Sequence, residues 1–443
     1  MIKNVNSLLL EPVVKNQIIF TQKARKLFVQ FPIIKTQLNM DLKLRFQLST
    51  MMFLNYFIWG AWYVTMGTYL GTTLSFSGAE IGVLYGAVSV AALVSPFFVG
   101  MIADRFFATE KILSFLHFVG GILFILIAQS TEFSWFYLFF QIYMLCFMPT
   151  IALTNSLSFR NLSDPNGEFP GIRVLGTIGF IVAVNIISFS KLEASEMMFY
   201  LAAASSFVLG GFSLVLPKTP PKDKGQKVTV SDVLGLKALN LLKGRSFLVF
   251  FIASVLICIP LAFYYAWANP FLNELGMENA GAKMTLGQVS ETVFLLVMPF
   301  FFRRLGVKWM LVVAMISWGL RYFLFAYGDL GALEWMLYGG IILHGICYDF
   351  FFVTGQIYVD NKAGEEVKGA AQGLITFATY GLGMLIGSYI SGWIVDYYLS
   401  ADGLTHNWKE IWMVPALGAM GVLLLFVLFF KEKKQDEKVE VNA

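Results

Sequence analysis

The sequence predicts an all-α integral membrane protein with twelve transmembrane helices in two halves of six. Its 443 residues are 57% hydrophobic and only 14% charged, with a mean hydropathy of +0.69, whereas about a quarter of the residues in soluble domains are charged. Apolar segments of membrane-spanning length recur along the chain, and one polar segment divides them. The three cysteines lie in apolar runs. These features exclude a soluble enzyme, a disordered chain and a disulfide-stapled secreted scaffold.

Twelve segments approach or exceed the roughly 20 apolar residues that a bilayer core requires of a helix. They are residues 47–73, 80–102, 112–129, 135–157, 173–190, 196–216, 247–272, 284–302, 309–327, 335–358, 369–396 and 410–430. We therefore expect a segment before the first span (1–46), an N-terminal half (47–216), a linker (217–246), a C-terminal half (247–430) and a tail (431–443). Small residues are frequent in the eleventh span and predict close helix approach there.

The basic residues set the expected orientation. Of the 32 Lys and Arg residues, all but Lys191, Lys283, Lys409 and Arg321 fall in the N-terminal segment, the linker, the tail or alternate short loops, with Arg173 counted at the end of its loop where the fifth span begins. Because basic residues stay on the cytoplasmic side, we expect both termini and the linker to be cytoplasmic.

Residues 1–39 differ from the rest of the chain. They are basic and only patchily apolar, and they lack the apolar core of a signal peptide. They are either an extension from an upstream start codon or a basic arm on the anionic inner leaflet. We expect them to be dispensable for transport.

The loop between the second and third spans carries a motif, G-M-I-A-D-R-F-F-A-T-E-K, that includes Gly100, Asp104 and Arg105. It resembles the loop signature of the major facilitator superfamily. The resemblance implies a major facilitator fold, two halves that rock around a midplane site, and a gating role for these three residues. The equivalent loop in the second half, F-F-R-R-L-G-V-K, keeps its basic residues but lacks the Asp.

Few charged residues lie within the spans. A charge near the bilayer centre costs about 3 kcal/mol even on a lenient scale, yet Glu291, Arg321 and Asp349 are inside spans and Arg173 stands within about a turn of the fifth. Arg321 is expected to neutralise an acid or to hold two helices together.

One predicted helix face combines a cation, a hydroxyl and an aromatic ring. Arg173, Thr177 and Phe180 are spaced i, i+4 and i+7, which places them on one stripe. Such a stripe suits a flat, polar ligand that stacks on the ring and is selected by hydrogen bonds.

Two later spans carry the buried acids. Gln288 and Glu291 share a face at i, i+3, whereas His344 and Tyr348 share one at i, i+4 with Asp349 beside them. We expect His344 to line the site rather than to relay protons. A structural ion pair is the alternative role for the two acids.

The coupling ion is predicted to be H⁺. Burial disfavours the charged form of a carboxylate, so Glu291 and Asp349 can load a proton on one side and release it on the other. The sequence shows no sodium-like cluster and no metal-ligand spacing, and we expect no cofactor.

Several motifs between Met40 and Phe430 resemble those of the nucleoside:H⁺ symporter family of bacterial major facilitator transporters, especially its less characterised branch. They are F-I-W-G-A-W-Y-V-T-M-G-T-Y-L, F-M-P-T-I-A-L-T-N-S, F-P-G-I-R-V-L-G-T-I-G-F, Q-V-S-E-T-V-F, L-R-Y-F-L-F-A-Y-G-D, Y-D-F-F-F and A-A-Q-G-L. The resemblance implies a nucleoside site made of Arg173, Thr177, Phe180, Gln288, Glu291, His344, Tyr348, Asp349 and Tyr265.

The sequence departs from the family pattern at two places. The well-studied nucleoside permeases have a tyrosine where His344 stands, and in the seventh span they have Gln and Asn where this chain has Ala262 and Tyr265. The loss of a polar partner can change selectivity by large factors.

The expected function is nucleoside import by H⁺ symport through alternating access. The alternative cargo is another sugar-bearing or heterocyclic metabolite. An enzyme is not expected, because clustered nucleophile, base or metal ligands are missing, and a non-transporting sensor fits the gating loop less well. We expect a monomer in the bacterial cytoplasmic membrane, surrounded by lipid and without a nucleic-acid partner.

Overall fold

The computed structural model describes residues 41–98, 107–221, 236–364, 367–401, 403 and 405–431. Within these ranges the regular structure is helical, apart from an isolated bridge between Leu399 and His406. The predicted gating residues Gly100, Asp104 and Arg105 lie outside the described residues, as do residues 1–39, residues 222–235 of the linker and nearly all of the tail.

The helices form two consecutive series. The first consists of α3 (Leu42–Gly60), α4 (Met66–Thr68), the π-helical η1 (Tyr69–Thr73), α5 (Gly78–Phe98), α6 (Thr109–Ala128), α7 (Phe133–Asn161), α8 (Pro165–Phe189) and α9 (Met197–Ser213). The second consists of the 3₁₀ segment η3 (Leu236–Lys243), α11 (Arg245–Glu274), α12 (Ala280–Tyr327), α13 (Glu334–Ile342), α14 (His344–Tyr348), the π-helical η4 (Asp349–Val353), α15 (Thr354–Lys362), α16 (Lys368–Thr376), the π-helical η5 (Phe377–Gly383), α17 (Met384–Tyr397) and α18 (Trp408–Phe429).

Nine helical stretches in the described ranges are long and apolar enough to cross a bilayer. The longest, α12, has 48 residues and would extend about 70 Å if straight, more than twice a bilayer core. It is interrupted at Gly306, where φ is 66° and ψ is 175°, a backbone conformation that glycine adopts readily. The interruption lies between the predicted spans 284–302 and 309–327. The total of twelve crossings stays a prediction, because α3 and the 17-residue α9 are not among the nine.

A capping motif begins α8 ahead of the predicted fifth span. Asp164 Oδ1 accepts a hydrogen bond from the Gly167 amide at 3.2 Å, and Glu168 Oε2 accepts one from the Asp164 amide at 3.1 Å. This reciprocal pattern, with Pro165 in the first turn, is a strong helix start. Arg173 therefore stands about two turns into α8, on a fully formed helix.

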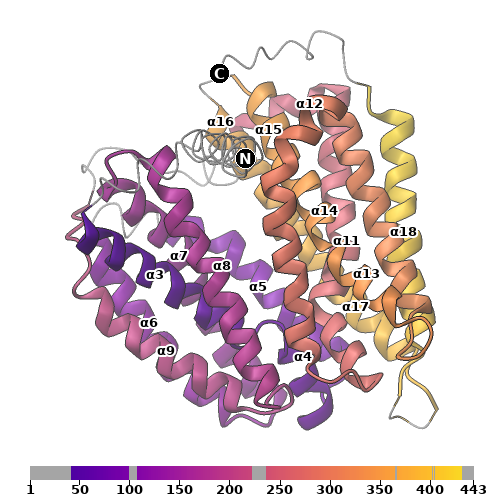
Figure 1. Cartoon of the computed structure of the whole chain (residues 1–443), viewed down its shortest axis with the longest axis horizontal. Coiled ribbons are helices and arrows are strands. Elements are labelled where there is room, and N and C mark those ends of the chain that lie inside the picture. The colour runs from indigo at the N-terminus through magenta and orange to yellow at the C-terminus, as the bar shows by residue number, and fades with distance from the viewer. Residues whose placement is uncertain are drawn as a thin grey trace, which may run out of the picture.

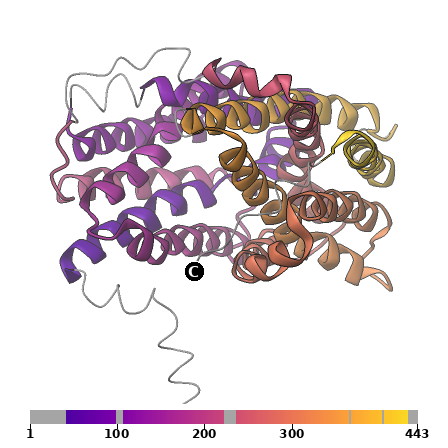
Figure 2. The ribbon, with the colours of Figure 1, turned by 90° about the horizontal axis from the view of Figure 1, so that it is seen from above.

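The two series form two groups of helices that lie side by side (Figure 1). In the first group α3 packs against α8, and α6 against α7 and α9; in the second, α11 packs against α17 and α18, and α12 against α14 and α18. Contacts between the groups run through α5 with α17 and α8 with α12, and the view from above shows the same division (Figure 2). The expected boundaries at residues 216 and 247 remain predictions.

Small residues let α5 and α17 approach closely. A Cβ atom built on Gly82 would lie 2.4 Å from the Ser388 carbonyl oxygen, and one built on Gly392 would lie 2.2 Å from the Gly78 oxygen. The backbones therefore touch without intervening side chains. Close approach was predicted for the eleventh span, and α17 confirms it.

Glu193 ties the two groups together at one end. It is buried in the turn between α8 and α9, and its Oε2 accepts hydrogen bonds of 2.8 Å from the side-chain amides of Asn269 and Asn273 on α11. Its Oε1 accepts a hydrogen bond of 2.8 Å from the Gly281 amide at the start of α12. A carboxylate of the first group thus binds two helices of the second.

Asp396 makes the reciprocal link. This residue of α17 accepts hydrogen bonds from the Gly78 and Ala79 amides at 2.5 and 2.7 Å. These amides open α5, where a carboxylate both satisfies free N–H groups and is favoured by the helix dipole. We call Glu193 and Asp396, with the groups they bind, the two-carboxylate link.

We expect Glu193→Ala to lower the thermal stability of the folded protein measurably. The substitution removes hydrogen bonds to a buried carboxylate, each of which contributes about 1.5–3 kcal/mol, so the thermal unfolding midpoint in detergent should fall by several degrees. Glu196→Ala is the matched control, because Glu196 lies in the same turn and its carboxylate accepts a hydrogen bond only from the neighbouring Ser195 hydroxyl in the described structure. Equal midpoints for the two variants would contradict this account of the link.

Candidate functional site

The predicted site residues lie on helices of both groups. Arg173, Thr177 and Phe180 are on α8, Tyr265 on α11, Gln288 and Glu291 on α12, His344 and Tyr348 on α14, and Asp349 opens η4. His344 and Asp349 are buried, whereas the others are half-buried. Because α8 packs against α12, and α12 against α14 and η4, these elements are neighbours at the boundary between the groups.

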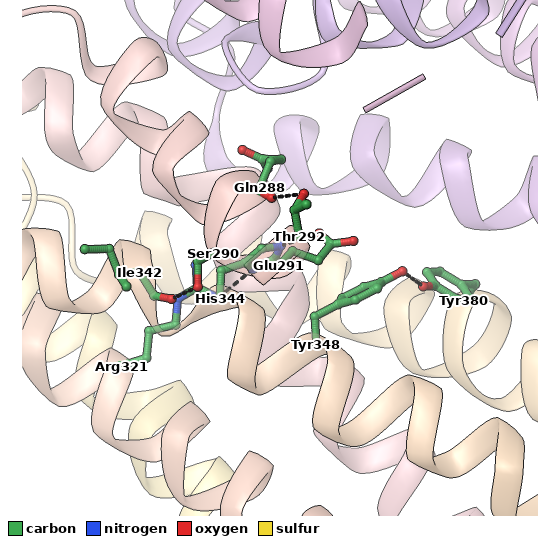
Figure 3. Close-up of polar contacts among 9 residues, drawn as sticks. All are labelled: Gln288, Ser290, Glu291, Thr292, Arg321, Ile342, His344, Tyr348 and Tyr380. Carbon is green, nitrogen blue, oxygen red and sulfur yellow. Dashed lines mark hydrogen bonds and ion pairs between the residues drawn. The ribbon is translucent and has the colours of Figure 1, made fainter. Parts of the chain in front are cut away.

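Glycines bring α12 and α14 together at the centre of the site. A Cβ atom built on Gly287 would lie 3.2 Å from His344 Cβ, and one built on Gly345 would lie 2.5 Å from the Ser290 backbone. The Ser290 hydroxyl also donates to the Ile342 carbonyl. This close contact sets the next residue of α12, Glu291, beside His344 (Figure 3).

His344 connects a carboxylate to a guanidinium. Its Nε2 lies 3.7 Å from Glu291 Oε2, and its Nδ1 lies 3.1 Å from Arg321 Nη1. The His344 and Arg321 side chains are buried, whereas the Glu291 side chain is 35% exposed. The three residues therefore form a chain that ends on an accessible carboxylate.

Tyrosine rings surround the imidazole of His344. Tyr264 stacks on it with ring centroids 5.3 Å apart, Tyr265 meets it edge-on at 6.3 Å, and Tyr348 lies at 5.8 Å. Aromatic neighbours at these distances restrict the orientation of the ring. His344 is thus held on several sides while Nε2 stays directed toward Glu291.

The expectation that Arg321 neutralises an acid is wrong for the described residues. None of their carboxylates lies within 4.0 Å of the guanidinium. Its charge instead faces the Tyr264 ring, whose centroid is 3.3 Å from Cζ. The alternative expectation, that Arg321 holds helices together, is confirmed, because α12 reaches α11 through Tyr264 and α14 through His344.

Asp349 opens a π-helical segment next to this chain. It is 2% exposed, and its Oδ2 has no hydrogen-bond partner in the described structure. Glu291 is close enough for the two carboxylate charges to interact. π-helical turns are rare and often occur at functional sites. Another π-helical segment near this chain, η5, supplies Tyr380, whose hydroxyl bonds to that of Tyr348.

Aromatic residues of α3 contact the α8 face that carries Arg173, Thr177 and Phe180. The guanidinium carbon of Arg173 lies 4.1 Å from the centroid of the Tyr56 ring, and Phe180 meets Trp59 edge-on at 6.4 Å. The charge of Arg173 also interacts with Glu291. The cation of one helix group and the accessible carboxylate of the other therefore face the same region.

The two residues of the seventh span that depart from the family pattern, Ala262 and Tyr265, lie in different surroundings. Tyr265 is half-buried between the groups, 5.6 Å from the ring of Tyr63 in the first group. Ala262 is buried instead against α17, because a Cβ atom built on Gly387 would lie 2.8 Å from the Ala262 Cβ. Tyr265 thus belongs to the cluster, whereas Ala262 packs away from it.

Sequence reasoning missed three residues that support the site. The ring of Tyr56 makes a cation–π contact with Arg173, and the ring of Tyr264 makes one with Arg321. The hydroxyl of Tyr380 bonds to that of Tyr348. The i, i+3 spacing of Tyr56 and Trp59 was a visible signal for the first. No spacing links Tyr264 or Tyr380 to its partner, because each contact joins separate helices.

A separate cavity of about 850 Å³ lies at the end that carries the two-carboxylate link. Its lining includes Thr68, Asn273 and Asp396, together with Glu274 and His406, which form an ion pair with 2.7 Å between Oε2 and Nδ1. The cavity shares no lining residue with the cluster around His344.

Known proteins resemble this chain over nearly its whole length. The sequence profile of the family described as "Nucleoside H+ symporter" matches residues 40–435. The Escherichia coli K12 protein named "Putative nucleoside transporter YegT" is 43% identical, covering 88% of this chain and 94% of its own length. Xanthosine permease of the same organism is 35% identical, covering 90% of this chain and 98% of its own length.

A solved structure agrees with the sequence matches. The crystal structure of the nucleoside transporter NupG superposes with a TM-score of 0.83 at 33% identity, covering 88% of this chain and all of that one. The fold is therefore the predicted major facilitator fold, and the function is that of a transporter rather than an enzyme. The chain belongs to the nucleoside H⁺ symporter family, and it is a multi-pass membrane protein for H⁺-coupled nucleoside import.

Proposed function

We propose that the cluster around Glu291 is the nucleoside site, and that Glu291 and Asp349 take up the coupling proton. The observation that carries the proposal is the position of Glu291. Its half-exposed carboxylate lies 3.7 Å from the imidazole Nε2 of His344 in its own helix group, and it interacts electrostatically with the cation of Arg173 from the other group. A ligand bound there contacts both groups, as alternating access requires.

The surrounding side chains match the chemistry of a nucleoside. Phe180, Tyr265 and Tyr348 offer rings on which a flat base can stack. Thr177 and Gln288 offer neutral hydrogen-bonding groups, and all five side chains are half-buried. A mostly apolar pocket with a few placed polar groups is typical of a small-molecule site.

The two acids differ in ways that suit proton uptake. Asp349 is buried with one oxygen unpartnered in the described structure, and a buried carboxylate without partners is costly when charged. Glu291 is accessible and interacts with Arg173 and Asp349. In our proposal a proton shared by this pair removes like-charge repulsion and accompanies the substrate.

The expected orientation in the membrane puts the two-carboxylate link at the outer face. With both termini cytoplasmic, the turn that holds Glu193 and the end of α17 that holds Asp396 face the exterior. The described structure then represents a state closed toward the outside. We propose that the protein works as a monomer in the bacterial cytoplasmic membrane.

A second cargo class is favoured by Tyr265. The seventh span contributes a phenol ring next to Tyr63 and His344, where the well-studied permeases have an amide. A ring there favours stacking over a directed amide hydrogen bond. Another sugar-bearing or heterocyclic metabolite is therefore the alternative substrate.

Glu291→Gln and Asp349→Asn should each abolish accumulation of labelled uridine or adenosine against a gradient. Each change keeps the shape of the side chain but removes the titratable group, so the internal-to-external ratio should fall to about one, the value without coupling. The measurement is uptake into transport-deficient cells with and without a protonophore, at equal protein levels in the membrane. Glu278→Gln is the control, because Glu278 is exposed in the turn before α12. The proton assignment fails if both variants still concentrate substrate.

Tyr56→Leu should weaken uridine binding about two- to fivefold, the amount expected from the loss of a partly exposed cation–π contact. Without the ring, Arg173 loses the support that holds it over α3. Calorimetric titration of the purified protein measures the change. Tyr56→Phe keeps the ring and should bind uridine as tightly as the parent; if the Phe and Leu variants bind alike, the ring does not support Arg173.

A further inference from the structure

Arg321 carries a charge that the proposed transport cycle leaves unused. Its side chain is 0% exposed, and its Nε and Nη2 groups have no hydrogen-bond partner in the described structure. The polar contact it makes there is between Nη1 and His344 Nδ1, at 3.1 Å. A buried cation is expensive unless it is compensated, so this contact requires an explanation beyond packing.

The contact fixes the protonation of His344. A guanidinium has only N–H donors, so Nδ1 must offer its lone pair and the hydrogen of the neutral ring must lie on Nε2. A doubly protonated ring would set an N–H group and a second positive charge against Arg321, which is strongly unfavourable in a low-dielectric interior. The geometry therefore selects the neutral Nε2–H form.

The Nε2–H group faces Glu291. The two atoms Nε2 and Oε2 are 3.7 Å apart, and no other carboxylate of the described residues lies within 4.0 Å of His344. The other groups around the ring, Tyr264, Tyr265 and Tyr348, are phenols. Among the described residues, the only acceptor of full negative charge that His344 can orient is thus Glu291.

Two contacts with α11 anchor Arg321, the base of the chain. Tyr264 of α11 covers the guanidinium of Arg321 and stacks on His344. The next residue of α12, Tyr322, donates a hydrogen bond of 2.6 Å to the Pro260 carbonyl of α11. Arg321 is therefore a fixed reference against which His344 is aligned.

We propose that Arg321 and His344 are positioning residues for substrate binding. Arg321 fixes the tautomer and the orientation of His344, and the Nε2–H group of His344 holds the Glu291 carboxylate toward the substrate. This inference rests on the proposed role of Glu291 in binding. It predicts that His344 acts through Glu291 and does not itself carry the transported proton.

Nitrogen NMR of histidine-labelled protein tests the tautomer without any substrate. The chain has three histidines, His117, His344 and His406, so the His344 signals are assigned by their absence from His344→Phe. We expect an unprotonated Nδ1 and a protonated Nε2 for His344, and loss of that preference in Arg321→Leu. A protonated Nδ1 or a doubly protonated ring in the parent protein would overturn the inference. Because no substrate is present, this result does not depend on the proposed function.

A double-mutant cycle on uridine affinity tests the action through Glu291. His344→Phe keeps a ring for stacking on Tyr264 but removes both nitrogens, and it should weaken binding about tenfold in the parent protein and less than about twofold in Glu291→Gln. His344→Gln can accept from Arg321 and donate to Glu291, so it should stay within about threefold of the parent. His117→Phe is the matched control, since His117 is a buried histidine of α6, and its effect should be equal in both backgrounds.

Each outcome of the cycle bears on a different claim. An equal loss from His344→Phe in both backgrounds, or no loss in either, overturns the positioning role. A Glu291→Gln variant that binds as tightly as the parent overturns the binding role of Glu291 and the positioning role with it. No uridine binding by the parent protein refutes uridine as the cargo of this site, and the tautomer measurement then still decides whether Arg321 orients His344.

Discussion

The structure depends on how charged groups are accommodated among apolar helices, where water is not available to solvate them. Arg173 lies over Tyr56, and Arg321 lies over Tyr264 and contacts His344. Glu193 is surrounded by amide donors. Glu291 and Asp349 are the exceptions, because one is partly exposed and the other keeps an unpartnered oxygen in the described structure. The incompletely satisfied acids are the groups with capacity to bind a substrate or a proton.

The link at one end and the site at the centre share two helices. On α11, Asn269 follows Tyr265 by about one turn, and it bonds to Glu193 whereas Tyr265 contacts His344. On α12, the Gly281 amide bonds to Glu193, and Glu291 lies about 15 Å further along the helix. Both helices that carry the candidate site residues on this side are therefore bonded to Glu193. In our proposal, this arrangement connects opening at the link to the geometry around the substrate.

The sequence was sufficient for features that depend on neighbouring positions along the chain. Apolar segment length predicted helices, and the i, i+4, i+7 spacing correctly placed Arg173, Thr177 and Phe180 on α8. Contacts between separate helices could not be predicted from the sequence. The approach of α12 and α14 depends on Gly287 and Gly345 facing His344 and Ser290, and the partner of Arg321 proved to be an imidazole and a phenol ring rather than an acid. Ala262 was placed by family resemblance at a binding position, whereas packing against Gly387 turns it away.

The central claim is that uridine and protons move together through the site that holds Glu291 and Asp349. The most direct measurement is the current evoked by uridine across proteoliposome membranes on a solid support. Uridine carries no charge, so symport predicts an inward positive current for the parent protein and none for Asp349→Asn, with uridine still bound by both. A parent protein that transports uridine without any current, or an Asp349→Asn variant that retains the full current, would contradict the account.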